Sequence, residues 1–101
     1  MKREIIDSPF ILRHWLYGQG CREPPKIIAL DTETTSLKYL ELDIIGFSLC
    51  DGKRACYVNV QSKYRQKLLD ILSFYLNEYD LLVIMHNSAY DICVLRKVGV
   101  L

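Results

Sequence analysis

The sequence lacks any long hydrophobic run, any signal-peptide core and any strong excess of charge of one sign. Its longest apolar stretch, Leu81 to Met85, is far shorter than the roughly 20 residues that a membrane-spanning helix needs. The residues that follow Met1 are charged instead of apolar. We therefore expect no membrane partner and a cytoplasmic location. The net charge of +1 gives no general affinity for a polyanion, so nucleic-acid binding would need a local site.

The cysteines also lack any spacing that is typical of a metal site or of a dense disulfide framework. The chain has four of them at irregular spacing and no Cys-x-x-Cys pair. We expect no zinc site and thiols that are reduced and mostly buried. Hydrophobic residues make up 50% of the 101 residues, which is enough for the core of one domain without covalent or metal staples. The four cysteines are Cys21, Cys50, Cys56 and Cys93.

Local patterns predict a mixed α/β domain in the order helix, strand, strand, strand, helix, strand, helix. Ser8 and Pro9 are typical of a helix start, and Gly18 of a helix end. The pair at 51–52 is Asp-Gly, which favours a tight hairpin turn. A hairpin joined to a strand–helix–strand crossover predicts a sheet with a three-strand antiparallel part, a parallel strand and flanking helices. The expected elements are helices over 9–17, 62–79 and 88–98, and strands over 26–31, 42–50, 54–60 and 81–85, with the first and last of these strands buried on both faces.

Two carboxylates lie at the end of the first buried strand. Asp31 and Glu33 are two residues apart, so in a strand they face the same side. Carboxylates placed together repel each other, and a Mg²⁺ or Mn²⁺ ion is the partner that best relieves this repulsion. The alternative is a solvated strand end at which Asp, Thr and Ser side chains form turn hydrogen bonds.

A third carboxylate, Asp91, follows the next buried strand. Taken alone, Ser88 and Asp91 fit a capping box, in which Ser88 caps a helix and Asp91 occupies its third position. Ligands in open α/β sheets, however, gather at the carboxyl ends of parallel strands. If the strands before Asp31 and before His86 are adjacent and parallel, the three carboxylates converge, as a metal site requires.

These residues carry a family resemblance. The sequence Leu-Asp-Thr-Glu-Thr-Thr-Ser-Leu at 30–37 and His-Asn-x-x-Tyr-Asp at 86–91 resemble the first two motifs of the DEDD 3′ to 5′ exonucleases, which have a ribonuclease-H-like fold. The resemblance is closest to the proofreading domain of bacterial family A DNA polymerases (DNA polymerase I). It covers about 26–101, so we expect 1–25 to be an N-terminal helix and linker and 26–101 to be a partial exonuclease domain.

The resemblance implies a two-metal hydrolase in which Asp31, Glu33 and Asp91 are catalytic and hold two Mg²⁺ or Mn²⁺ ions. Its expected substrate is the single-stranded or frayed 3′ end of DNA during replication, with a polymerase domain in the parent chain. The alternatives are a DEDD-type 3′ to 5′ ribonuclease, and a non-catalytic module that packs on a polymerase or binds single strands. The residues that the resemblance places against the terminal nucleotide are Thr32, Thr34, Leu37, Asn87 and Tyr90.

The family's third motif, Tyr-x-x-x-Asp or His-x-x-x-x-Asp, has only decoy matches here. Tyr39 and Asp43 have the tyrosine spacing, but Tyr39 lies between the first motif and the second strand, and Asp91, which has the histidine spacing from His86, already belongs to the second motif. In the family that this chain resembles, the third motif supplies the general base. We therefore expect an N-terminal portion of the domain, truncated before its last strand and helix. Alone it should be nearly inactive, because general-base assistance raises the rate of hydrolysis by about 10² to 10⁴-fold. The strand over 81–85 would then be a bare edge, through which we expect self-association.

Overall fold

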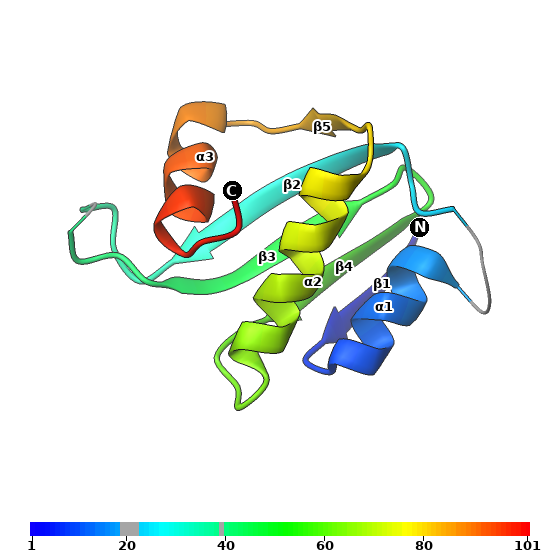
Figure 1. Cartoon of the computed structure of the whole chain (residues 1–101), viewed down its shortest axis with the longest axis horizontal. Helices are drawn as coiled ribbons and strands as arrows, with labels where there is room; N and C mark the ends of the chain where they lie inside the picture. Colours follow the sequence, from blue (N-terminus) through cyan, green and yellow to red (C-terminus); the bar gives the residue numbers. More distant parts are fainter. Residues whose placement is uncertain (19–22, 39) are drawn as a thin grey trace.

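The chain forms one mixed five-stranded sheet with three helices, within the residues that this computed structural model describes, 1–18, 23–38 and 40–101 (Figure 1). Six of the predicted elements begin or end within a few residues of the expected position, and the strand over 26–31 extends further, to Thr34. In chain order the elements are β1 Lys2–Ile6, α1 Pro9–Tyr17, β2 Ile27–Thr34, β3 Ile44–Cys50, β4 Arg54–Asn59, α2 Arg65–Glu78, β5 Leu82–Ile84 and α3 Ser88–Lys97.

The strand order is β1-β4-β3-β2-β5. The strands β4, β3 and β2 are antiparallel, and β5 runs parallel to β2, so the predicted three-strand antiparallel part with a parallel neighbour is confirmed. One strand was not predicted: β1 pairs in parallel with β4. Only one of its side chains, Ile6, is buried, and a strand joined mainly through its backbone leaves little pattern in the sequence. The division of the chain at residue 25 stays a prediction.

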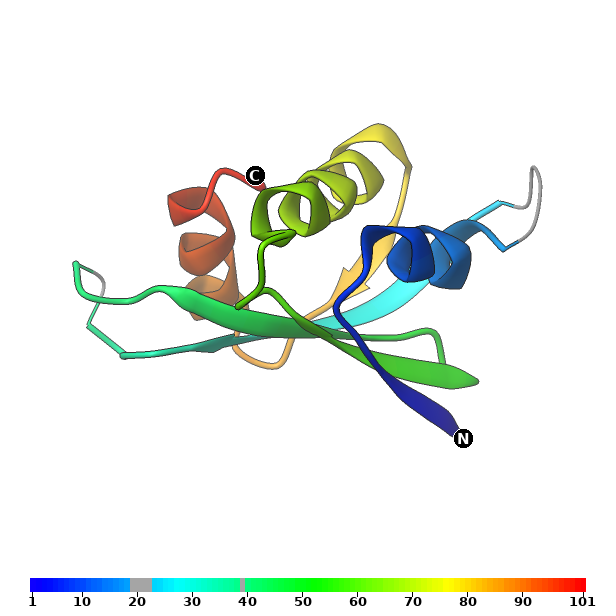
Figure 2. The same ribbon diagram turned by 90° about the horizontal axis from the view of Figure 1, so that it is seen from below.

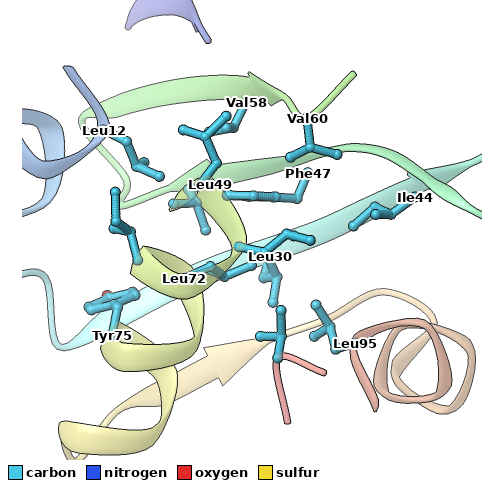
Figure 3. Close-up of a cluster of buried hydrophobic side chains, with 14 of the residues drawn as sticks. Leu12, Leu30, Ile44, Phe47, Leu49, Val58, Val60, Leu72, Tyr75 and Leu95 are labelled. Carbon is cyan, nitrogen blue, oxygen red and sulfur yellow. The ribbon is translucent and has the colours of Figure 1, made fainter. Parts of the chain in front are cut away.

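All three helices lie on the same face of the sheet (Figure 2). Side chains from each helix meet the sheet in one continuous core (Figure 3). Leu12 comes from α1, Leu72 and Tyr75 from α2, and Leu95 from α3, and these residues belong to the same buried cluster as Phe47 on β3. Core burial on this face therefore fixes how α3, which carries Asp91, sits against the sheet.

No described helix covers the other face, which we call the open face. It displays Ile27 and Leu82 with more than half of their surface exposed, and Ile5 with 80% exposed. The expectation that β2 and β5 are buried on both faces is therefore wrong. Both strands are apolar without alternation, but only one face of each meets the helices, so Ile28 is buried while its neighbour Ile27 is not. The described part of the chain contains no helix long and apolar enough to cross a membrane.

The turn between β3 and β4 confirms the predicted hairpin. Gly52 has a φ of 93°, in the left-handed region that glycine tolerates. The Asp51 carboxylate accepts hydrogen bonds from the amides of Lys53 and Arg54 at 2.9 and 2.7 Å, and it forms an ion pair with the Arg54 guanidinium at 3.0 Å. These contacts fix the hairpin register.

The cysteines agree only in part with the expectation of buried thiols. Cys56 is buried, and this burial raises the pKa of its thiol to about 12. Cys50 is half-buried, and Cys93 is exposed on α3, so the expectation is wrong for Cys93. Cys21 lies outside the described residues. All three described cysteines are free.

Candidate active site

The acidic pair of the first motif lies on the open face. Asp31 pairs with Ser48 across the β2–β3 ladder, and Glu33 pairs with Gly46, so both side chains leave the same side of β2. Both are exposed. The longer β2 is what places Glu33, like Asp31, within the sheet instead of in the following loop. Two carboxylates therefore stand side by side on a surface that no described helix covers.

Asp91 reaches the same strand from the helix side. It lies in the first turn of α3, where the positive end of the helix dipole favours a carboxylate, and it is only 1% exposed. Its Oδ1 accepts a 2.6 Å hydrogen bond from the hydroxyl of Thr32 and a 3.3 Å bond from the Thr32 amide. Its Oδ2 is buried and has no hydrogen-bond partner among the described residues. A buried carboxylate oxygen without a donor carries a desolvation cost, which a cation or an ordered water would offset.

The capping box proposed for this segment is wrong. The helix α3 begins at Ser88 itself, its N-cap is Asn87, and that cap makes no side-chain hydrogen bond. The Asp91 carboxylate bonds to Thr32 on β2 instead, because α3 packs its Asp91 and Leu95 side against the sheet. The alternative reading of the second motif as a local helix cap is thereby removed.

The three carboxylates do not form a closed cluster. No group of three His, Cys, Asp or Glu side chains in the described ranges lies close enough to share a metal ion. The reason is the alternation of β2: Thr32, which holds Asp91, faces the helices, whereas Asp31 and Glu33 face the other way. The predicted adjacent and parallel arrangement of β2 and β5 is confirmed, but the predicted convergence is not observed.

Several residues expected to contact a nucleotide are engaged with one another. The hydroxyls of Thr34 and Tyr90 form a hydrogen bond, and their oxygens lie 3.0 and 3.3 Å from the carbonyl oxygen of Ser36. Because each hydroxyl has one proton, the two groups make two of these three bonds at a time. Thr32 is bonded to Asp91. By contrast, Leu37 is 86% exposed. Asn87, also exposed, stands at the start of α3, and its contact with substrate, like those of the other four residues, stays a prediction.

The loop that carries Leu37 is anchored at its base. The Thr35 amide donates to the Asp43 carbonyl at 3.0 Å, and the Asp43 amide donates to the Thr35 hydroxyl at 3.1 Å. Arg65, at the start of α2, ties this base to the helix layer through a 2.7 Å ion pair with Asp43 and a 3.1 Å bond to the Ile44 carbonyl. Tyr39 lies outside the described residues. The exposed Leu37 therefore projects from a loop with fixed ends.

A pocket of about 520 Å³ opens beside Asp31. Asp31 and Ser48 supply polar groups to its wall, Ile84 supplies apolar surface, and His86 stands at the end of β5. This volume is in the range of pockets that hold small ligands. Of the acidic pair, Asp31 borders a cavity of the size of a nucleotide-like ligand, and Glu33 lies outside its lining.

One residue near the acidic pair, Tyr57 on β4, was not predicted from the sequence. Burial raises the pKa of its phenol, and a hydrogen bond to Glu33 and the negative charge of Glu33 raise it further. The contact spans β3 at Gly46, where an added Cβ would lie 2.2 Å from the Tyr57 hydroxyl. The signal was present in the alternation of β4, which directs Tyr57 away from the core residues Cys56 and Val58.

Comparisons with known proteins agree with the motifs. A model of the 3′-5′ exonuclease family matches residues 5–101. Among solved structures, NrnC from Brucella melitensis with bound Mg²⁺ and the same protein bound to pGG are each 21% identical to the chain, with TM-scores of 0.59. The matches cover 93% of this chain but only 42% and 41% of those chains. No curated protein gives a significant match.

The structural likeness, at this low identity, concerns the fold. It confirms the expected ribonuclease-H-like α/β architecture, with a mixed five-stranded sheet and helices packed on it. The family match covers nearly the whole chain and includes both motifs, at 30–37 and 86–91. The chain therefore belongs to the 3′-5′ exonuclease family.

Proposed function

We propose that the open face around Asp31 and Glu33 is the active face of a metal-dependent exonuclease that removes nucleotides from the 3′ end of a single strand. The observation that carries the proposal is the arrangement around β2. Two exposed carboxylates share one side of the strand, and a buried carboxylate, Asp91, is bonded to Thr32 between them. A strand end that needed only turn hydrogen bonds would not require a buried carboxylate beside it.

The donor set fits a divalent cation. Asp31 and Glu33 offer hard oxygen ligands, which Mg²⁺ and Mn²⁺ prefer. Asp91 does not lie close enough to share an ion with this pair, so its unpartnered Oδ2 would support the site through water. Bound ions would activate a water molecule and stabilise charge on the attacking and leaving oxygens of the phosphodiester. The chain's own residues bind and orient: Asp31 and Glu33 hold the metal, and the Thr32 bond fixes Asp91.

The loop after β2 supplies the part of the proposed site that contacts the terminal nucleotide. Leu37 is exposed at 86% on a loop whose base is anchored by Thr35, Asp43 and Arg65. An apolar side chain held there can wedge against the base of the terminal nucleotide. The start of α3 lies beside the same loop, because Tyr90 bonds to the Ser36 carbonyl, and from there Tyr90 and the exposed Asn87 would face the sugar and phosphate. Residues 26–101 supply these groups, with 1–25 as the preceding helix and linker.

The substrate is either the 3′ end of DNA or short RNA. The family A polymerase character of the two motifs favours the frayed 3′ end of DNA, with a polymerase domain as the partner in the parent chain. A second candidate, the 3′ to 5′ hydrolysis of short RNA, is favoured by one observation: a structure with the same fold is bound to pGG, a phosphorylated dinucleotide. The two candidates share the acidic pair and differ in the 2′-hydroxyl of the substrate.

The test is the direction and metal dependence of hydrolysis. We would incubate the chain at high concentration with Mn²⁺ and 5′-labelled single strands of DNA and RNA of matched sequence. We expect slow shortening one nucleotide at a time from the 3′ end, blocked by a 3′-terminal phosphate and abolished by Asp31→Asn. The rate is expected to be low, because general-base assistance, worth about 10² to 10⁴-fold, is not supplied by the three carboxylates.

The matched control is Glu78→Gln, which removes an exposed carboxylate at the end of α2 and should leave the rate unchanged. Cleavage that persists in Asp31→Asn, or that proceeds from the 5′ end, would contradict the proposal. So would the absence of both hydrolysis and Mn²⁺-dependent binding of the 3′ end. A rate on RNA that exceeds the rate on DNA would favour the second candidate.

A further inference from the structure

Glu33 on β2 has Tyr57 on β4 as a neighbour on the open face, although β3 lies between the two strands. Adjacent strands lie about 4.8 Å apart, so side chains separated by an intervening strand are normally kept apart by the side chain of that strand. Here the intervening residue is Gly46, which pairs directly with Glu33.

The absence of a side chain at Gly46 is what opens the path. A Cβ built there would lie 2.2 Å from the hydroxyl oxygen of Tyr57, 2.4 Å from its Cζ and 2.6 Å from the carbonyl oxygen of Val58. No real Cβ approaches other atoms so closely. The Tyr57 ring therefore occupies the space that any other residue at position 46 would fill, and its hydroxyl lies over Gly46, the residue that pairs with Glu33.

The register of the β3–β4 hairpin determines which side chain of β4 lies over Gly46 and points toward β2. Tyr57 pairs with Ser48, and Ser48 pairs in turn with Asp31, so Tyr57 is aligned with the first carboxylate and leans diagonally toward the second. The Asp51 turn fixes that register through its bonds to Lys53 and Arg54. A slip by one residue would move Tyr57 to the helix side of the sheet.

We propose that Tyr57 is a positioning residue for Glu33: its hydroxyl donates to the carboxylate across Gly46 and holds it in one orientation on the open face. Glu33 is exposed, and no ion pair restrains it within the described residues. An unrestrained glutamate samples many rotamers, which must be frozen when it binds a metal. A donor beside the carboxylate reduces that cost before the ion arrives. The value of this orientation for metal binding rests on the function proposed above.

The first test measures the orientation itself, without metal. In Tyr57→Phe the ring remains and only the hydroxyl is lost, so packing over Gly46 is kept. Three-bond couplings of the Glu33 side chain, measured by NMR, should show one dominant χ1 rotamer in the unchanged chain and rotamer averaging in Tyr57→Phe. The control is Tyr64→Phe, which removes a hydroxyl from a residue that contacts Lys63 before α2, and it should leave the couplings unchanged.

The second test measures Mn²⁺ affinity by electron paramagnetic resonance of the free ion. Loss of a hydrogen-bond partner of a metal ligand typically weakens metal binding by about 10- to 100-fold, and we expect about 10-fold for Tyr57→Phe. A thermal unfolding temperature close to that of the unchanged chain would show that the effect is not a loss of fold.

The two proposals fail in different ways. Equal couplings in Tyr57→Phe and the unchanged chain would overturn the positioning role, whatever the metal does. Mn²⁺ binding that is absent from the unchanged chain, or that survives Asp31→Asn, would overturn the proposed function, while the couplings would still decide whether Tyr57 orients Glu33. Equal Mn²⁺ affinity in Tyr57→Phe, with binding abolished in Asp31→Asn, would overturn only the link between orientation and metal binding.

Discussion

The hydroxyl of Thr32 donates to the carboxylate of Asp91 at 2.6 Å and so joins β2 to the first turn of α3, across 59 residues of sequence. The same carboxylate leaves its other oxygen unpartnered in the interior. A group retained at this cost is better explained by function than by stability, since buried charges contribute little to stability unless all of their hydrogen bonds are made.

The Thr32 contact predicts that two substitutions of Thr32 lower the stability of the fold by different amounts. Thr32→Val removes the hydroxyl and leaves Oδ1 with only the 3.3 Å amide bond. Because hydrogen bonds to charged groups contribute about 1.5 to 3 kcal/mol, the free energy of unfolding should fall by about 2 kcal/mol. Thr32→Ser keeps the donor and should lose clearly less. Denaturant titration followed by circular dichroism measures both, and a Thr32→Val variant as stable as Thr32→Ser would argue against the contact.

Gly46 should tolerate no side chain, for two separable reasons. Its missing Cβ would meet the Tyr57 ring and also the Val58 carbonyl at 2.6 Å. A side-chain end can move, but a backbone carbonyl within a sheet cannot do so cheaply, so Gly46→Ala should cost about 1 to 3 kcal/mol. Adding Tyr57→Ala should therefore restore only part of the loss caused by Gly46→Ala. A double-mutant cycle by chemical denaturation checks this, and complete restoration would mean that the carbonyl plays no part.

The hairpin turn predicts a pH dependence of stability. Burial raises the pKa of Asp51, but bonds from the amides of Arg54 and Lys53 and the Arg54 guanidinium outweigh it, so the pKa lies below 3.8. A carboxyl whose pKa is lowered by folding stabilises the fold above its unfolded pKa, and this contribution is lost as the pH falls through the folded value. Unfolding followed from pH 7 down to pH 2 should show this loss below about pH 4, and Asp51→Asn should lose less over that range. Identical pH profiles would contradict the assignment.

The edge strand β5 predicts self-association. It lies at one end of the strand order, and Leu82 and Ile84 are each more than half exposed. Exposed apolar edges pair with other strands, and a lysine on such an edge opposes pairing. Sedimentation velocity at rising concentration should reveal dimers or larger species, which Leu82→Lys should reduce. A strictly monomeric profile for the unchanged chain at high concentration would contradict this expectation.

The sequence predicted the elements best where local chemistry decides. Pro9 after Ser8 marked the start of α1, and Asp51-Gly52 marked the hairpin, because those residues act on their own backbone. The parallel pairing of β2 with β5 also followed, from the crossover rule. The strand β1 did not, since its pairing with β4 depends on the backbone and leaves only Ile6 buried.

The sequence predicted which residues form the candidate site, but it predicted their arrangement in space only in part. Spacing placed Asp31 and Glu33 on one side of a strand, but it could not show that the helices cover only the other side. The partner of Asp91 is Thr32 instead of its own helix end, and a contact over 59 residues depends on how α3 packs on the sheet. The proposed contact of Tyr57 with Glu33 depends on the strand register and on the missing side chain of Gly46 together.

The divalent-metal site proposed for β2, with Asp91 of α3 beside it, is tested most directly by an NMR titration of the ¹⁵N-labelled chain with Mg²⁺, followed by trace Mn²⁺. We expect shifts and paramagnetic broadening centred on Asp31, Glu33 and Asp91, weakened in Asp31→Asn. Broadening centred elsewhere on the chain, or no perturbation of these three residues even at high Mg²⁺ concentration, would contradict it.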